Sequence, residues 1–459
     1  MSFVVREKSF YKWFFSLFIS IALQALISFV VNFADNIMIG MYAQSSMSGV
    51  SLVNQIQYLL MQISTGIASG VVVLSAQYWG KGEVEPIRRI IALGMKFALL
   101  TGAIFTIVTH FYPAQCLSLL TDEPEIIEQG VEYLTYISFT YLVFTFSNTL
   151  ILSYRSVEST KIAPVAALCS LVVNVFLNYL LIFGNLGFPE MGAKGAGLAT
   201  LTARLAELLI VVIYVRFVDK KLKIRFSSWL KPDWEYLWDY LRVSIPVVAA
   251  CASWGVGTFL QASILGHVGA SAVAANSIAS TMFQTSTIFY RGTTGASSII
   301  IGKTIGAGQT DKIRTYSRTI QLLFLGFGIV SALIIMLLRS FILDYYTLTS
   351  EARSLTHTFM LILAITVVGT SYEYPVVAGI IQSGGDTKYG LIVDTAFTFL
   401  FTLPLSYISA FVFRWPPEVT YLCLKLDQIA KCLPNGIKVN RYKWIRVLTR
   451  EAKNSVPET

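Results

Sequence analysis

Long apolar runs recur along the chain, and each is long enough to cross a lipid bilayer. A membrane-spanning helix needs about 20 predominantly apolar residues. Such runs lie near residues 14–40, 50–74, 90–113, 131–154, 162–184, 193–218, 243–266, 272–301, 315–338, 355–382, 389–413 and 417–437. Because lipid offers no partner to an unpaired backbone amide, each run must be a helix. The sequence therefore predicts an all-α integral membrane protein with about twelve transmembrane helices.

Charged residues are scarce, and their positions predict the orientation of the chain. Only 13% of the residues are charged, against about 25% in soluble proteins. The net charge of +9 comes from basic residues in alternate loops, such as Lys81, Arg88 and Arg89, and in the tail. The opposite loops are uncharged at 45–49 and acidic at 121–130. By the positive-inside rule, we expect a multi-pass protein of the cell inner (cytoplasmic) membrane with both termini in the cytoplasm, and no nucleic-acid partner.

The twelfth span is the least apolar, because Lys425, Asp427, Gln428 and Lys431 interrupt it. If this segment lay on the membrane surface, the basic tail would end on the side opposite the other basic loops, against the same rule. We therefore expect residues 417–437 to cross the membrane.

The motifs of enzymes and metal sites are missing from the sequence. Five cysteines occur without CxxC spacing, and the three histidines do not cluster with them. Neither a disulfide framework nor a zinc site is expected. The patterns HExxH, GxSxG and GxxxxGK[ST] do not occur, which argues against a membrane enzyme and an ATP-driven pump. We expect no enzymatic activity and no cofactor.

The two halves of the chain resemble each other at an offset of about 226 residues. The segment AQYWGKGEVEPIRR at 76–89 corresponds to IGKTIGAGQTDKIR at 301–314, in an alignment that places Gly80 on Gly306 and Gly82 on Gly308. Likewise, RSVESTK at 155–161 answers QSGGDTK at 382–388. Each half has an even number of spans, so both copies keep the same orientation and are related by an axis along the membrane normal. We expect two six-helix lobes built as a parallel internal repeat.

One long charged connector divides these halves. We expect an N-terminal lobe at 1–218, a cytoplasmic linker at 219–234, a C-terminal lobe at 235–437 and a basic cytoplasmic tail at 438–459. Duplicated six-helix lobes are typical of carriers that rock around a central cavity.

An acidic residue stands inside the first span, in the sequence VNFADNIMIG at 31–40. An ionised carboxylate at membrane depth costs at least about 2.5 to 3.5 kcal/mol, so Asp35 marks an ion path or a polar pairing. Asn174 and Asn178 sit four residues apart on one face of the fifth span. These three side chains suit a hard cation or a tuned proton carrier. The amides also suit simple contacts between helices, and water or an amide near the outer end of the span would satisfy Asp35.

Several short motifs occur in a characteristic order. They are ADNIMIG in the first span, GKG and GAG after spans two and eight, NVFLN in span five, GAKGAGLAT before span six and GGDTK after span ten. In order and spacing they resemble the multidrug and toxic compound extrusion (MATE) family, secondary transporters that couple drug export to inward sodium or protons. The resemblance covers nearly the whole chain. The major facilitator superfamily expects a basic GxxxDRxGRR loop after span two, which WGKGEVEPIRR does not fit.

The resemblance implies a cation-coupling site in the first lobe. The family's aspartate in span one matches Asp35, its two polar residues in span five match Asn174 and Asn178, and its threonine in span six matches Thr200. Some members carry a second aspartate where this chain has Asn178. One titrating group then remains among the matched positions, which mildly favours sodium and leaves the ion open. No metal is expected beyond sodium at Asp35, Asn174 and Asn178.

The second lobe departs from one branch of the family, which has a glutamate in span seven. That position holds Cys251 here, so no site is carried over. Glu373, in the sequence SYEYP, and Asp394, in span eleven, are intramembrane carboxylates. Each suits a cationic drug, a proton relay or a polar pair inside the bundle.

Two arginines also lie within predicted spans. Arg204 and Glu207 are three residues apart and are expected to pair on one helix face. Arg291 either meets an acid or snorkels to the interface.

The resemblance implies a secondary active multidrug antiporter that exports lipophilic, often cationic drugs or toxic metabolites in exchange for inward sodium or protons. We expect it to act as a monomer in the lipid bilayer. The alternative is a flippase for lipid-linked sugars or other amphipathic lipids. Its cavity would present several cationic residues to phosphates, and Arg204 and Arg291 are the candidates for that role.

Overall fold

The computed structural model describes residues 4–121, 123–224, 233–345 and 349–450. All regular secondary structure in these residues is helical, as predicted. The predicted linker and tail lie partly outside the described residues, at 225–232 and 451–459.

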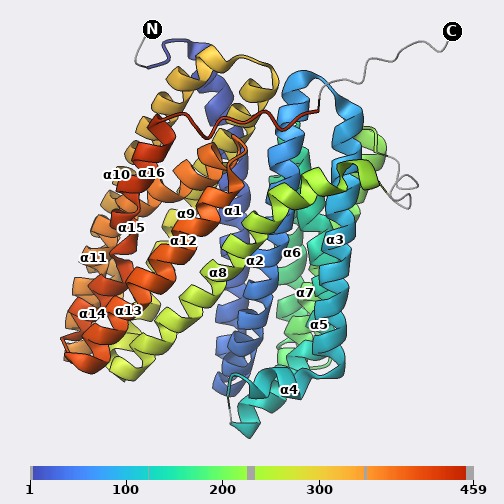
Figure 1. The fold of residues 1–459 in the computed structure, drawn as a ribbon. Helices are drawn as coiled ribbons and strands as arrows, with labels where there is room; N and C mark the ends of the chain where they lie inside the picture. The colour runs from blue at the N-terminus through green and yellow to red at the C-terminus, as the bar shows by residue number, and fades with distance from the viewer. Residues whose placement is uncertain (1–3, 122, 225–232, 346–348, 451–459) are drawn as a thin grey trace, which may run out of the picture.

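The first lobe contains six long helices and short connecting turns (Figure 1). Its elements are α1 (Lys8–Tyr42), α2 (Gln44–Lys81), α3 (Val84–Phe111), the short α4 (Pro113–Ser118), α5 (Pro124–Ser156), α6 (Ile162–Leu181), the turn η1 (Asn185–Gly187), and α7 (Gly192–Ile213) continued by η2 (Tyr214–Val218). A single residue, Ala43, separates α1 from α2. Residues 45–49, expected in a loop, therefore form the start of α2, where the Ser46 hydroxyl donates to Gln129 Oε1 at 2.6 Å.

The second lobe repeats this plan with more interrupted helices. Its elements are α8 (Trp234–Val268), α9 (Ala270–Gly306), α10 (Thr310–Tyr345), α11 (Ser350–Pro375) continued by η4 (Val376–Ile381), then α12 (Thr387–Ala396), η5 (Phe397–Thr402), α13 (Leu403–Tyr407) and η6 (Ile408–Val412), and finally α14 (Pro417–Lys425), α15 (Asp427–Ala430) and α16 (Cys432–Asn440). The regular part of α11 ends at Pro375, because proline has no N–H to continue the helical hydrogen bonds.

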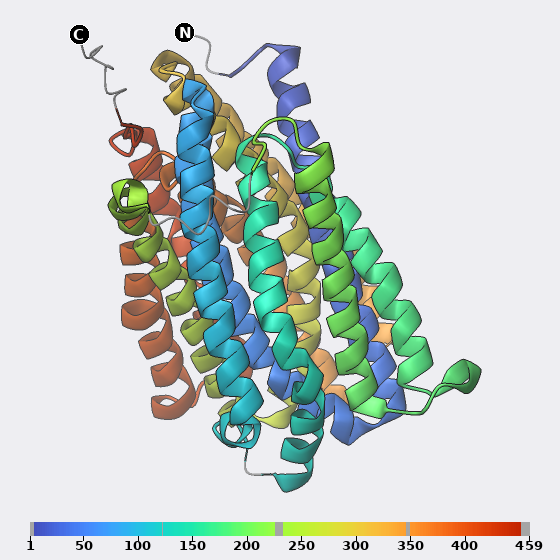
Figure 2. The same cartoon turned by 90° about the vertical axis from the view of Figure 1, so that its right-hand side faces the viewer.

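Twelve membrane spans result, as the sequence predicts. Ten helices in the described residues are long and apolar enough to cross a membrane by length and composition. The remaining two are α9 and the composite helix α14–α16. The start of α1 and the last described segment, 441–450, lie at the same end of the bundle (Figure 2), which we call the terminal face.

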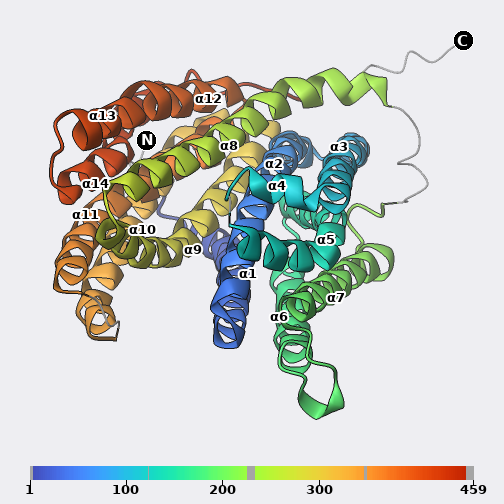
Figure 3. The ribbon, with the colours of Figure 1, turned by 90° about the horizontal axis from the view of Figure 1, so that it is seen from below.

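The leading helix of each lobe begins in the core of the other lobe. Phe14 and Phe18 of α1 lie in one buried cluster with Ile320 and Phe324 of α10. In the corresponding place, Tyr240 of α8 is buried in a first-lobe cluster formed largely by α2, α3, α5 and α7. Seen from below, α1 lies between α9 and α6 (Figure 3). The lobes are thus connected through α1 and α8.

The helix ends at the terminal face bring the two lobes together. α2 packs against both α8 and α9. At the repeat-related Gly80 and Gly306, a Cβ atom would run into the backbone of the facing helix, at Lys303 and Gln77 respectively. Only glycine permits this close approach of α2 and α9. The repeat seen in the sequence thus creates a symmetric crossing point between the lobes.

The chain after α16 crosses this face. Residues 441–450 run from the second lobe to the first and form no regular helix (Figure 1). Trp444 within this segment is fully buried.

Candidate functional site

The predicted first-lobe residues lie together between α1, α6 and α7. Asn178 Nδ2 donates a hydrogen bond to Asp35 Oδ1 at 2.5 Å. The same nitrogen lies 3.2 Å from Asn174 Oδ1, and Asn174 Nδ2 donates to Thr200 Oγ1 at 3.3 Å. One continuous polar chain therefore connects the carboxylate in α1 to the hydroxyl in α7.

Local helix geometry explains this arrangement. Asn174 and Asn178 are one turn apart on α6, so both amides face the same side. Both are buried, as is Thr200, whereas Asp35 is half-buried. Asp35 stands seven residues before the end of α1 at Tyr42, which places it about 10 Å along the helix from that end. The site therefore lies inside the span on the side opposite the terminal face.

Asp35 is held by an amide. Within the described part of the chain, no lysine or arginine forms an ion pair with Asp35, and its side chain accepts a hydrogen bond from the amide of Asn178. Arg204 is close enough to interact electrostatically. However, Arg204 Nη1 lies 2.7 Å from Glu207 Oε2, so these two charges largely neutralise each other. The expected pairing of Arg204 with Glu207 is confirmed.

One oxygen at the site is unsatisfied. Asn178 Oδ1 is buried and has no hydrogen-bond partner. A buried carbonyl without a donor costs about 1 to 3 kcal/mol. A carboxylate, two amide oxygens and a hydroxyl are the ligand types that a hard cation prefers. The first-lobe site therefore has the chemistry to accept a small cation or a proton.

The second-lobe carboxylates lie in a different environment. Asp394, on α12, is 3.3 Å from Lys431 Nζ, and Asp427 is 3.0 Å from the same nitrogen. Glu373, on α11, is buried and interacts electrostatically with Lys431 and Asp394. Three acids therefore surround one lysine, whose side chain is fully buried.

Lys431 is the residue that the sequence analysis did not assign to this site. Its signal was present, because Asp427 and Lys431 are four apart in a predicted span and can pair on one helix face. Their contact with Asp394, 37 residues away from Lys431 along the chain, depends on how the helices pack. Of the alternatives for Asp394, the polar pair inside the bundle is the arrangement observed.

Two further arginines lie close to each other between the lobes. Arg155, at the end of α5, donates to Gln24 of α1 and interacts electrostatically with Arg291 of α9. Arg155 Nε is buried without a hydrogen-bond partner. Neither arginine forms an ion pair among the described residues. Arg291 is also within electrostatic reach of Tyr58 on α2 and of Tyr374 on α11, so it lies between the lobes.

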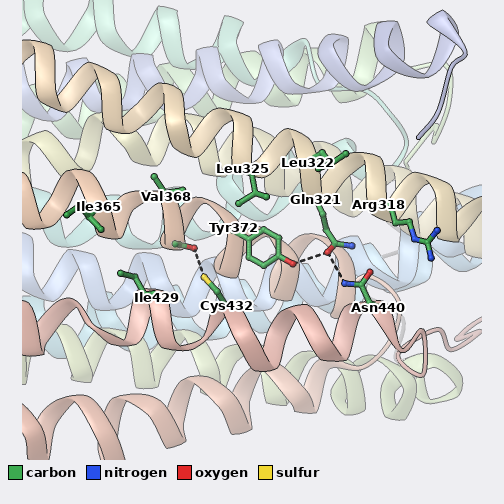
Figure 4. A pocket seen from close by; sticks show the side chains of 11 residues that line it. Arg318, Gln321, Leu322, Leu325, Ile365, Val368, Tyr372, Ile429, Cys432 and Asn440 are labelled. Carbon is green, nitrogen blue, oxygen red and sulfur yellow. Dashed lines mark hydrogen bonds between the residues drawn. The ribbon is translucent and has the colours of Figure 1, made fainter. Parts of the chain in front are cut away.

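A groove of about 720 Å³ lies elsewhere on the second lobe, between α10, α11 and α15–α16 (Figure 4). Its walls are mostly apolar. At one end the Tyr372 hydroxyl donates to Gln321 Oε1 at 2.9 Å, and Asn440 reaches the same oxygen at 3.4 Å. Neither Glu373 nor Asp394 lines it, so the groove is separate from the acidic cluster.

Comparison with known sequences identifies relatives over most of the chain. The sequence profile described as MatE matches residues 20–180 and 246–408, one segment in each lobe. A "Probable multidrug resistance protein NorM" of Thermotoga maritima is 24% identical over 443 residues, covering 94% of each chain. A protein of the same description from Rhizobium meliloti is 26% identical over 314 residues, covering 67% of this chain and 66% of its own.

Solved structures share the fold. A transporter of the MOP superfamily from Pyrococcus furiosus superposes with a TM-score of 0.85 at 19% identity, covering 96% of this chain and 97% of its own. The Vibrio cholerae MATE transporter VcmN also gives 0.85, at 17% identity, covering 94% and 97%. At these identities the likeness concerns the fold alone.

Proposed function

This chain belongs to the MATE family of efflux transporters, and from that premise we propose that it is a cation-coupled multidrug antiporter. It exports lipophilic, often cationic compounds in exchange for inward sodium or protons. Relatives described as probable multidrug resistance proteins support this substrate class. The observation that carries the proposal is Asp35, an acid at membrane depth that is held by an amide and lacks a resident cation.

The coupling ion binds at Asp35, Asn174, Asn178 and Thr200. Asp35 supplies the negative charge, and Asn178 Oδ1 supplies an oxygen that has no other partner. A sodium ion would bind both oxygens, and a protonated Asp35 would instead donate its O–H to an amide oxygen. Because only one group among the four residues titrates, we favour sodium as the coupling ion.

Helix α1 connects the ion site to the opposite lobe. Its outer part carries Asp35 beside α6 and α7, and its inner part packs in the second-lobe core through Phe14 and Phe18. Occupancy of the site changes how α1 packs on α6 and α7, and this change reaches the second lobe through the same helix. Ion and drug are coupled because they favour different conformations of the two lobes.

The membrane potential supplies useful energy for this exchange. Each positive charge that moves inward across 100 mV contributes about 2.3 kcal/mol, which corresponds to roughly a fifty-fold concentration gradient. One ion per cycle therefore suffices for export.

The basic terminal face is proposed to lie in the cytoplasm, with the protein in the inner membrane. Lys81 ends α2, Lys161 precedes α6 and Lys312 lies in the first turn of α10, all at this face, in accordance with the positive-inside rule. The lobes are in close contact here, at Gly80 and Gly306, so we take the conformation as closed toward the cytoplasm. We propose a monomer as the working unit, because one chain holds both lobes and the complete ion site.

A second candidate is a flippase for lipid-linked sugars or other amphipathic lipids. Arg155 and Arg291 favour it, because two arginines that lie between the lobes and form no ion pair with the described acids suit a phosphate group. For the Pyrococcus furiosus transporter, a reverse polarity of the binding pocket has been taken to suggest a different function.

Reconstituted vesicles test the first candidate. Purified protein is placed in liposomes with ethidium, and a sodium gradient and a proton gradient are imposed separately. We expect the sodium gradient to drive ethidium transport. Transport driven by the proton gradient alone would assign the proton as coupling ion. If neither gradient drives ethidium but a fluorescent phospholipid changes leaflet, and Arg291→Ala stops this movement, the flippase is the correct function.

A further inference from the structure

The segment 441–450 is fixed to both lobes at the terminal face. On the second lobe, the Trp444 indole is fully buried against Gly384, and its Nε1 donates to Val439 O at 2.7 Å. Arg446 N donates to Gly384 O at 2.7 Å, and its guanidinium lies 3.4 Å from Asp386. Residues 444–446 are therefore held by the loop between α11 and α12.

The following residues are held by the first lobe. Leu448 packs on the buried first-lobe cluster that contains Tyr78. Arg450 N donates to the Tyr78 hydroxyl at 3.1 Å, and Lys81 Nζ donates to Arg450 O at 2.6 Å. Arg450 Nε lies 2.6 Å from Asp239, at the start of α8, in the region where α8 packs on the first lobe.

Gln77 of α2 joins both sets of contacts. Its Oε1 accepts from Leu448 N at 2.8 Å, and its Nε2 donates to Arg446 O at 3.2 Å and to Ser383 O at 3.3 Å. The Gln77 side chain is fully buried, and all three partners belong to the second half of the chain. A buried side chain with its hydrogen bonds satisfied in this way fixes one geometry.

The internal repeat relates the Gln77 contact to a contact of the other lobe. At the offset of 226, Gln77 corresponds to Lys303, which pairs with Glu158 of the first lobe at 2.8 Å. The same helix position in each lobe therefore contacts the other lobe at this face. On the Gln77 side, the backbone of residues 446 and 448 adds hydrogen bonds to this pair of contacts.

We propose that residues 441–450 form a latch that holds the cytoplasmic side closed, and that the first-lobe contacts of Leu448 and Arg450 must release before this side opens. This inference rests on the proposed alternating transport. The physical basis of the latch is the short length of chain between its two anchors. Leu448 is the fourth residue after Trp444, and an extended chain spans at most about 3.3 to 3.6 Å per residue, or about 14 Å over these steps. The two anchors therefore cannot move farther apart than this length while both stay in place.

The contacts of Arg450 are expected to release first. Arg450 and its acidic partners are partly exposed, and such ion pairs typically contribute about 0 to 1 kcal/mol. Gln77, Leu448 and Trp444 are less exposed to solvent, and their contacts hold the rest of the segment in place. The latch therefore opens from its outer end toward the buried tryptophan.

The experiment measures the distance between the lobes directly. Spin labels are placed at Lys161→Cys in the first lobe and Lys312→Cys in the second, in a chain whose five native cysteines are replaced. Truncation after Val447 removes the first-lobe contacts of Leu448 and Arg450, and it keeps Trp444 and the hydrogen bond from Gln77 to Arg446 O. Truncation after Arg450 is the matched control, because it retains the whole latch. We expect the first truncation to raise the population of the longer distance at least about tenfold, from the loss of several hydrogen bonds, and the control to match the full chain.

A second variant keeps the chain at full length. Gln77→Glu places carboxylate oxygens against the carbonyls of Arg446 and Ser383, so it should shift the same population in the same direction. Identical distance distributions in the Val447 truncation, Gln77→Glu and the full chain would overturn the latch. The distance measurement needs no transport activity. If the distance between the spin labels shifts in a protein that transports no ethidium, the latch is supported and the proposed antiport is refuted.

Discussion

The two lobes bury carboxylates in opposite ways. In the first lobe, Asp35 meets the neutral amide of Asn178 at 2.5 Å and has no ion-pair partner in the described residues. In the second lobe, Asp394 and Asp427 meet Lys431 at 3.3 and 3.0 Å, and the lysine is fully buried. The first-lobe carboxylate therefore lacks a basic partner among the described residues, whereas the second-lobe carboxylates share a lysine.

This difference assigns unequal roles to two halves with the same fold. A carboxylate with neutral partners gains free energy when a cation arrives, so its occupancy follows the ion concentration. A carboxylate beside a fixed lysine already has a countercharge, and removal of either charge leaves the other unpaired in a dry site. We therefore expect the first lobe to respond to the coupling ion and the second lobe to depend on its cluster for stability.

The strongest test of the comparison is Asp35→Asn. The amide keeps the shape of the side chain and removes the negative charge that we propose attracts the ion, so we expect gradient-driven ethidium export to fall to the level of protein-free liposomes. The exposed Asp311→Asn, at the start of α10, is the control and should transport at the parental rate. Parental transport by a folded Asp35→Asn protein would refute the coupling role.

Lys431→Met tests the second lobe. The substitution leaves Asp394, Asp427 and Glu373 without their shared cation, and loss of one partner of a buried pair typically costs about 3 to 5 kcal/mol. We expect a corresponding decrease in the free energy of unfolding in detergent. Adding Asp427→Asn should recover part of this loss, since it removes one unpaired charge. A single variant as stable as the parent would show that the lysine does not neutralise the cluster.

Asn178→Asp makes the first lobe more acidic. A second carboxylate beside Asp35 raises the negative charge at the site, and affinity for a hard cation rises with the charge of its ligands. We expect the sodium concentration for half-maximal transport to fall about tenfold, corresponding to about 1.4 kcal/mol. Asn174→Ser keeps a hydroxyl without adding charge and should not produce this increase in affinity. If the sodium dependence of transport is unchanged in Asn178→Asp, Asn178 does not contribute to ion binding.

The smallest effect is expected for Asp394→Asn. Lys431 keeps Asp427 at 3.0 Å, so it remains paired, and the amide of the new side chain can still accept a hydrogen bond. We expect ethidium export within about threefold of the parent and a loss of about 1 kcal/mol in stability. Loss of transport comparable to that of Asp35→Asn would show that the second lobe also carries the ion.

Much of this architecture could be predicted from the sequence because it depends on local patterns. Apolar length predicts the spans, and the repeat predicts two lobes in one orientation. Spacing brings Asn174 and Asn178 to one face, and the family resemblance selects Asp35 and Thr200 as their partners. These four residues do lie in one polar chain, whereas their role in coupling stays a prediction.

The remaining features depend on contacts between distant segments. Lys431 was visible as a charge in a weak span, but no spacing rule relates it to Asp394 on another helix. Gln77 gives no local sign that it binds residues more than 300 positions away. The tail has neither apolar periodicity nor a motif, so its course across the terminal face could not be predicted.

The exchange of leading helices has a consequence for how the protein is made. The first-lobe core includes Tyr240 and Val243 of α8, so six helices emerging from the ribosome still lack part of their interior. Likewise, the phenylalanines at the start of α1 become buried only after α9 and α10 have been synthesised and have packed against them. Each half therefore depends on a helix of the other half to complete its core. We expect folding to finish only after the second-lobe helices have packed around the start of α1.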